Sequence, residues 1–127
     1  MEVDKPEVLR EVNAACDRYE EALMSNDLDT LDALFFDAPQ TLRYGVGENL
    51  YGIDEIRAFR LARPGGSPSR RVLKRVVSSF GDDFATSNLE FQREGSDKIG
   101  RQSQTWLRTD EGWRIVAAHV SLMGGSH

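Results

Sequence analysis

Apolar residues recur at helical spacing in the first half of the chain. Between residues 6 and 24 they stand three or four positions apart, the pattern of one buried face of an amphipathic helix: Val8, Val12, Ala15, Tyr19 and Ala22. Pro6 is tolerated in the first turn of such a helix. The same spacing predicts a second, shorter helix over 28–35 and a third over 53–62. The first half is therefore predicted to be mainly helical, with Tyr19 on a buried stripe.

The second half changes to the alternating pattern of β-strands. Turns rich in Gly, Asp and Ser separate its apolar runs, as tight hairpins require. The predicted strands, with one earlier strand included, cover 40–46, 71–80, 84–93, 98–109 and 112–121. The predicted order is thus α-α-β-α-β-β-β-β. It indicates an α+β fold in which three N-terminal helices pack on one face of a curved antiparallel sheet.

The last predicted strand carries an imidazole and a hydroxyl on the same face as apolar groups. Side chains alternate between the two faces of a strand, so one face has Trp113, Ile115, Ala117, His119 and Ser121. Such a face could line a cavity that is apolar at one end and polar at the other. The alternative is that His119 and Ser121 only satisfy backbone groups near the end of the strand.

The neighbours of these two residues depend on how the last two strands pair. If residue numbers across the hairpin sum to an odd value, Gln104 lies beside His119 and Gln102 beside Ser121. A one-residue bulge would instead place Ser103 beside His119. In either register the face gains polar groups that can hold a carbonyl or a carboxylate. Gln104, His119 and Ser121 are therefore candidate substrate-binding residues.

Length and charge describe an ordinary globular protein with a single domain, residues 1–127. The formal net charge of −5 at pH 7 disfavours nucleic acid as the main partner. No apolar run approaches the ~20 residues of a membrane span, and the acidic start does not resemble a signal peptide. The sequence therefore predicts a cytoplasmic protein with no membrane partner.

Metal and thiol chemistry find little support in the sequence. The single cysteine, Cys16, cannot alone form a structural zinc site, and its helical neighbours favour a buried structural thiol over a nucleophile. The only histidines are His119 and His127, and the carboxylates do not cluster at ligand spacing. We therefore expect neither a metal nor another cofactor.

Three stretches resemble one bacterial family and together cover much of the chain: LRYGVGENLYGIDEIRAFR, FGDDFATSNLEFQREG and IGRQSQTWLRTDEGWRIVAAHVSLM. With the element order, they resemble the NTF2-like superfamily and, within it, the AtzH-like or HpxZ-like branch. That branch is found with amidases in bacterial cyanuric acid and oxalurate catabolism. The resemblance implies a sheet that wraps as a cone over its helices. It also implies processing of a small N-carboxylated urea, with 1,3-dicarboxyurea going to allophanate as the best case.

The resemblance further implicates a tyrosine of the first helix and an arginine of the first strand, which match Tyr19 and Arg43. A dicarboxylated urea is a flat dianion, and a guanidinium binds a carboxylate through two parallel hydrogen bonds. Tyr19 could donate a proton to the departing urea nitrogen. The alternatives are a solvent-facing or paired arginine and an ordinary core tyrosine. Arg57 and Arg60 stand three apart on the third helix; one of them, with Arg57 as the candidate, could close the pocket, although such pairs are more often solvated.

Two functional hypotheses follow, and they belong to different classes. The first is a cofactor-independent decarboxylating amidohydrolase that acts on a small anionic urea derivative. The alternative is a non-catalytic protein that binds a ureido acid or stabilises a partner amidase; a structural oligomer with a vestigial pocket is a third reading. A homodimer is expected in each case, because the late strands carry apolar residues on both faces and the second face needs a cover.

Overall fold

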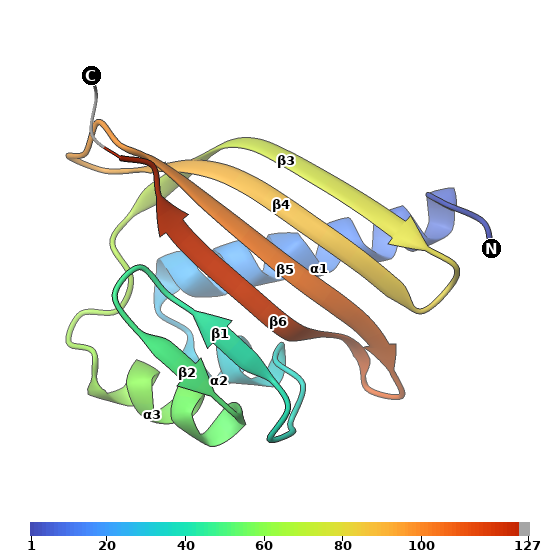
Figure 1. The fold of residues 1–127 in the computed structure, drawn as a ribbon, viewed down its shortest axis with the longest axis horizontal. Coiled ribbons are helices and arrows are strands. Elements are labelled where there is room, and N and C mark those ends of the chain that lie inside the picture. Colours follow the sequence, from blue (N-terminus) through green and yellow to red (C-terminus); the bar gives the residue numbers. More distant parts are fainter. Residues whose placement is uncertain (125–127) are drawn as a thin grey trace.

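The computed structural model describes residues 1–124, which form three helices and a six-stranded sheet (Figure 1). In chain order the elements are α1 (Pro6–Ser25), α2 (Leu28–Ala33), β1 (Leu42–Tyr44), β2 (Asn49–Tyr51), α3 (Ile53–Ala62), β3 (Arg70–Phe80), β4 (Phe84–Arg93), β5 (Ile99–Thr109) and β6 (Gly112–Leu122). Within this described range, no helix is both long and apolar enough to cross a membrane. The α+β class predicted from the sequence is confirmed.

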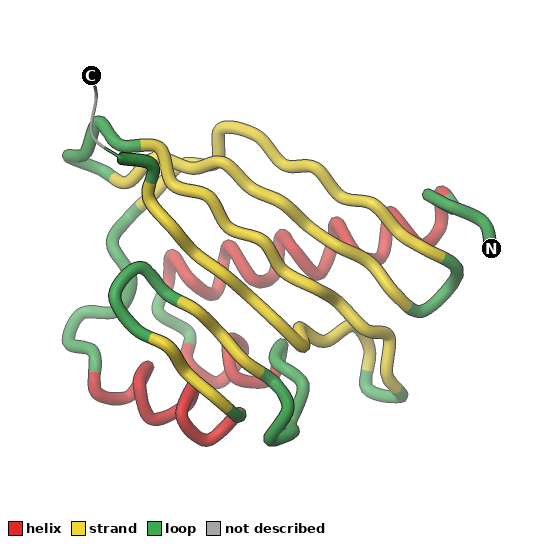
Figure 2. Tube along the Cα trace, viewed as in Figure 1, coloured by secondary structure: helices red, strands yellow, loops and turns green. Residues whose placement is uncertain are grey.

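The strands form one twisted sheet in the order β2-β1-β6-β5-β4-β3. Strands β3 to β6 are an antiparallel meander, whereas β1 pairs antiparallel with β2 and parallel with β6. In Figures 1 and 2, α1 crosses one face of the meander, and α2 and α3 lie beside the two short strands. Helix α1 contacts β3 and β6, α3 contacts β1 and β2, and α2 contacts both of the other helices.

Two details of the predicted topology are wrong. Residues 49–51, which lie between the predicted first strand and third helix, form the additional strand β2, because the chain reverses tightly after β1: the Gly45 N–H donates to the Glu48 carbonyl at 2.8 Å. The first strand is also shorter than predicted and pairs parallel with β6, so the sheet is not wholly antiparallel. A parallel pair needs a long connection, and most of the chain lies between these two strands.

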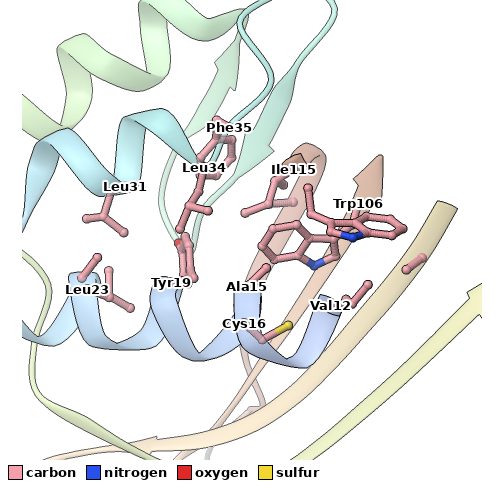
Figure 3. Packing of buried hydrophobic residues seen from close by; sticks show 14 of the residues in the cluster. Val12, Ala15, Cys16, Tyr19, Leu23, Leu31, Leu34, Phe35, Trp106 and Ile115 are labelled. Atoms are coloured by element: carbon pink, nitrogen blue, oxygen red, sulfur yellow. The ribbon is translucent and has the colours of Figure 1, made fainter. Parts of the chain in front are cut away.

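A core between α1 and the sheet fixes the position of the long helix. Trp106 and Ile115 project from β5 and β6 against Val12 and Ala15 of α1 (Figure 3). The buried side chains of α1 recur at helical spacing: Val8, Val12, Ala15, Cys16, Tyr19, Ala22 and Leu23. Truncating a buried Trp to Ala costs about 3–5 kcal/mol of stability. The Trp106 contact therefore holds α1, and with it Tyr19, in a defined place on the sheet.

The junction between α1 and α2 is set by two neighbouring residues. Asn26 ends α1 in the left-handed region with φ 54°, a conformation that Asn tolerates better than most residues. Asp27 then caps α2, since its carboxylate accepts hydrogen bonds from the Thr30 backbone N–H at 3.2 Å and the Thr30 hydroxyl at 2.7 Å. These hydrogen bonds lower the pKa of Asp27. The sharp turn directs Leu31 into the core.

A β-bulge in β6 reverses which side chains face inward along its second half. Trp106 pairs with Ile115 but Thr105 pairs with Ala117, which leaves Val116 as an extra residue. Buried residues therefore have odd numbers before the bulge and even numbers after it: Trp113, Ile115, Ala118 and Val120. This change decides which residues of β6 can reach the interior.

Candidate functional site

Tyr19 of α1 and Arg43 of β1 line the same hollow between the helices and the sheet. Arg43 pairs across strands with Ala118, which is buried, so Arg43 also faces inward. Tyr19 is buried, and the centre of its ring lies 6.3 Å from that of Phe35. Figure 3 shows the Tyr19 side chain projecting from α1 toward Leu34 and Phe35. The remaining lining residues are Leu23, Leu50, Ile56, Phe59, Arg60 and Arg63.

Arg43 is held by a carboxylate and an aromatic ring. Its Nη1 donates to Glu48 Oε1 at 3.2 Å, and its guanidinium carbon lies 5.9 Å from the centre of the Phe59 ring. Glu48 reaches Arg43 by folding over the α-carbon of Gly45, where any β-carbon would overlap the Glu48 carboxylate. A side chain at position 45 would therefore displace the Glu48 carboxylate from this position. The Arg43 side chain is 13% exposed, so it remains in contact with solvent.

Arg60 of α3 is buried beside the same hollow. Its side chain is 5% exposed, and its guanidinium carbon lies 4.8 Å from the centre of the Phe35 ring. The ion pair with Asp32 is long, 3.7 Å between Nε and Oδ1, and Arg60 Nη1 is buried with no hydrogen-bond partner in the described part of the chain. Burial lowers the pKa of Arg60, and the positive charge of Arg43 lowers it further.

Arg63 follows the last residue of α3 and completes the basic cluster. Its guanidinium carbon lies 5.3 Å from the centre of the Phe59 ring, so Phe59 contacts both Arg63 and Arg43. Arg63 Nε is buried, and within residues 1–124 it has no hydrogen-bond partner. Burial lowers the pKa of Arg63, and the nearby charge of Arg43 adds to the shift. Three arginines thus line the one hollow.

The hollow is small as these side chains lie. Its free volume is about 10 Å³, enough for one water molecule. Two larger hollows, of about 450 Å³ each, lie elsewhere and are lined by neither Tyr19 nor Arg43. A larger ligand can therefore bind at Tyr19 only if a lining side chain moves. Arg63 is the lining residue best placed to do so, since it is half-buried and stands beyond the end of α3.

Gln104 lies at a second small hollow that Tyr19 also lines. The Trp106 indole N–H donates to Ser87 Oγ at 2.9 Å, and the Ser87 hydroxyl in turn donates to Gln104 Oε1 at 3.3 Å. Because the amide oxygen of Gln104 accepts from Ser87, its Nε2 faces away from Ser87. That Nε2 is buried and has no partner among the described residues. Gln104 thus presents a free donor close to Tyr19.

His119 and Ser121, predicted to line the pocket, face away from both hollows, so the structure does not bring them together with Tyr19 and Arg43. The bulge at Val116 turns them to the other face of the sheet, and His119 pairs with Ser103. His119 is exposed there, and its ring packs edge-on against Tyr44, with 5.6 Å between ring centres. The sequence allowed this register as one of two, and nothing in the alternation selected between them.

Arg57, the predicted candidate from the third helix, does not line the hollow of Tyr19 and Arg43 either. It forms an ion pair with Asp37 at 3.7 Å and lines one of the two large hollows, which lies between α2 and the β5–β6 turn. Arg60 takes the predicted place, because it follows Ile53 and Ile56 on the buried face of α3. Arg60 stands seven residues after Ile53 and four after Ile56, so it shares the helix face of both. Arg57 is next to Ile56 in the sequence and points to a different face, so the spacing could have favoured Arg60 over Arg57.

Metal binding finds no support in the geometry of the described chain. Among residues 1–124, the His, Cys, Asp and Glu side chains form no group of three that could hold a metal ion. His127 lies outside the described residues. Cys16 is buried in the core, and burial raises the pKa of its thiol. The polar side chains of the first hollow at Tyr19 are arginines, and those of the second include Glu20, Ser87, Gln102 and Gln104.

Comparison with known proteins gives a consistent picture. The model of the AtzH-like family matches residues 1–126. A protein of unknown function from Pectobacterium atrosepticum, described as a member of the DUF3225 family, has 56% identity over 96% of this chain and 95% of its own, with a TM-score of 0.93. A protein from Burkholderia xenovorans, described as having a cystatin-like fold, has 44% identity over 99% of both chains and a TM-score of 0.94.

More distant structures share only the fold. An NTF2-like superfamily protein from Salmonella enterica has 21% identity over 95% of this chain and 94% of its own, with a TM-score of 0.78. The open, curved sheet with helices on one side is therefore the NTF2-like fold. No sequence of a curated protein matches the chain.

Proposed function

Because the chain belongs to the AtzH-like family, we propose that it is a cofactor-independent enzyme that cleaves a small N-carboxylated urea. The substrate that we assign is 1,3-dicarboxyurea, and the product is allophanate. The observation that carries this proposal is that Tyr19 and Arg43, from different elements, line one hollow. A proton donor and a carboxylate-binding group can there act on the same ligand. The sheltered position of Tyr19 supports the proposal, since acid catalysis is stronger away from bulk water.

The reaction breaks one bond between a urea nitrogen and a carboxyl carbon. The electron pair of that bond stays on the nitrogen, which takes up a proton. When water attacks the carboxyl carbon, the products are allophanate and bicarbonate; when it does not, carbon dioxide leaves directly and one proton is consumed. Both routes need the same proton at the same nitrogen, so both need an acid at that position.

Arg43 binds a substrate carboxylate in this mechanism. A guanidinium can offer two parallel N–H groups to a carboxylate, and only one N–H of Arg43 is used by Glu48. Its positive charge also stabilises the negative charge that develops on the urea as the bond breaks. The contact with Phe59 orients the guanidinium without using any of its N–H donors.

Tyr19 supplies the proton to the departing nitrogen. Its ring is fixed by burial on α1 and by Phe35, so its hydroxyl has a defined position at the hollow. Gln104 assists from the second hollow, where its unpartnered Nε2 can donate to the urea carbonyl. The hydrogen-bond chain through Ser87 keeps that amide in the donating orientation.

The proposal is tested by carbon NMR on isotopically labelled 1,3-dicarboxyurea, which is generated in place because it is labile. Faster appearance of labelled allophanate with the purified protein than in buffer alone supports the enzyme. Equal rates in both samples would overturn the catalytic assignment and leave a protein that binds ureido acids without converting them. Thermal stabilisation by allophanate, without turnover, would then identify this alternative.

A further inference from the structure

We propose that Arg60 and Arg63 form a second carboxylate subsite, which makes the hollow selective for small dicarboxylates over monocarboxylates. The inference builds on the proposed function, because it concerns the hollow of Tyr19 and Arg43. It is a statement about binding, however, and it can be tested with acids that the protein does not convert.

The first argument comes from unpaired donors. Arg60 Nη1 and Arg63 Nε are both buried, and neither has a hydrogen-bond partner in the part of the chain that the structure describes. A buried polar group without a partner is costly, and a charged one more so. One of these groups stands in the last turn of α3 and the other on the residue that follows the helix, and both residues line one hollow. An anion that binds there would satisfy both.

The second argument is the balance of charge. Arg43, Arg60 and Arg63 bring three positive charges to the hollow, and the carboxylates paired with them are Glu48 and Asp32. The Asp32 pair is long, 3.7 Å between Arg60 Nε and Asp32 Oδ1, so it neutralises Arg60 only in part. Net positive charge therefore accumulates at the hollow, in a protein whose formal net charge is −5. A bound anion lowers that electrostatic cost.

The third argument is that one carboxylate does not serve all three arginines. Arg43 faces inward from β1, whereas Arg60 and Arg63 come from α3, and Phe59 lies against both Arg43 and Arg63. A carboxylate has two oxygens and pairs well with one guanidinium fork. A ligand with carboxylates at both ends of a short chain can satisfy Arg43 with one group and the α3 arginines with the other.

Glutarate and butyrate are matched probes for this subsite. Glutarate has the same number of chain atoms between its carboxylates as 1,3-dicarboxyurea and carries no carbon–nitrogen bond to cleave. Butyrate keeps the chain length and lacks one carboxylate. Titration calorimetry measures both acids against the wild type and against Arg60→Gln, Arg63→Gln and Arg57→Gln. Arg57 is the matched control, because it lies on the same helix outside the hollow.

We expect the wild type to bind glutarate at least about tenfold more tightly than butyrate. Arg60→Gln and Arg63→Gln should each remove most of the preference for glutarate and change the affinity for butyrate by no more than about twofold. Arg57→Gln should leave the affinities for both acids unchanged. Arg63→Gln carries the test if Arg60→Gln does not fold, since Arg63 is only half-buried.

Three results would overturn the subsite: equal affinity of the wild type for the two acids, no loss of preference in the folded variants, or equal loss for both acids. The last would show a general positive field and no separate subsite. None of these results depends on turnover. If the wild type prefers glutarate but does not convert dicarboxyurea, the subsite is supported and the proposed enzyme activity is wrong.

Discussion

The arginines around the hollow differ in how many of their N–H groups are already paired within the protein. The unpaired N–H groups are the ones available to a ligand. Arg43 gives one N–H to Glu48, Arg60 lies at a long distance from Asp32, and Arg63 Nε has no partner in the described chain. Glu48 thus occupies part of the place that a substrate carboxylate would take at Arg43. A ligand has to compete with this internal carboxylate.

Glu48→Gln should therefore tighten anion binding. The amide oxygen can still accept from Arg43, while the negative charge that repels a carboxylate ligand is removed. We expect glutarate affinity to rise by roughly threefold or more, and the rise to shrink with added salt as exposed charges are screened. Titration calorimetry at low and high salt measures this. Glu90→Gln, on the exposed side of β4, is the control and should change nothing; weaker binding in Glu48→Gln would mean that its charge positions Arg43 instead.

The sequence could predict part of this site. Alternation in the first strand together with the family resemblance identified Arg43, and helical spacing placed Tyr19 on the buried stripe. Arg60 was within reach of the same reasoning, since it continues the stripe of Ile56 on α3. His119 was not, because a single extra residue in β6 turns its side chain to the opposite face.

At the scale of elements, α2 links the core to the basic cluster. It contributes Leu31 to the core, and Asp32 on its next position pairs with Arg60 of α3. The helix has only 6 residues, so its own hydrogen bonds contribute little and its cap matters. The capping residue Asp27 is fully exposed, and its hydrogen bonds to Thr30 lower its pKa.

Asp27→Ala should lower the melting temperature at neutral pH, and the difference from the wild type should narrow in acid. A carboxyl whose pKa is lower in the folded state stabilises the fold above its unfolded pKa, about 3.9, and loses that contribution as pH falls through the folded value. Thermal melts followed by circular dichroism between neutral pH and about pH 2 check this. Asp29→Ala, in the first turn of the same helix, is the control. A difference that stays constant down to low pH would contradict the role of the charged cap.

Elements with a clear period were predicted well and short or irregular ones were not. The helix over 53–62 was predicted with the bounds that the structure has, because its apolar spacing is regular. Strand β2 has only 3 residues, too few to show alternation, and the bulge in β6 leaves no signal in the pattern of apolar residues. Pairing of β1 with β6 depends on contacts between distant parts of the chain, which no local pattern reports.

At the scale of the whole molecule, the helices cover one side of the sheet and its other side carries exposed apolar groups. Tyr51, Val76 and Phe84 are 54%, 48% and 42% exposed there. Ala118 and Val120, which strict alternation had assigned to this face, are instead buried on the helix side because of the bulge. The homodimer expected from the sequence would cover this face.

Leu107→Lys should weaken that homodimer. Leu107 pairs with Phe84 on the outer face, so a lysine there would place a charge in the interface. Sedimentation at micromolar concentration should give twice the mass of one chain for the wild type and a larger share of monomer for the variant. Leu61→Lys is the matched control, since Leu61 is 76% exposed on α3 and away from this face. A wild type that sediments as a monomer would contradict the dimer.

The most direct test of the account compares the rate of 1,3-dicarboxyurea cleavage in the wild type, Tyr19→Phe and Tyr44→Phe, followed by carbon NMR. Both substitutions remove one phenolic hydroxyl, but Tyr19 lines the hollow and Tyr44 lies on the other face of the sheet. If Tyr19 donates the proton, Tyr19→Phe should lose about 10²–10⁴-fold in rate and keep glutarate binding, while Tyr44→Phe keeps both. Equal rates in wild type and Tyr19→Phe would contradict the central claim.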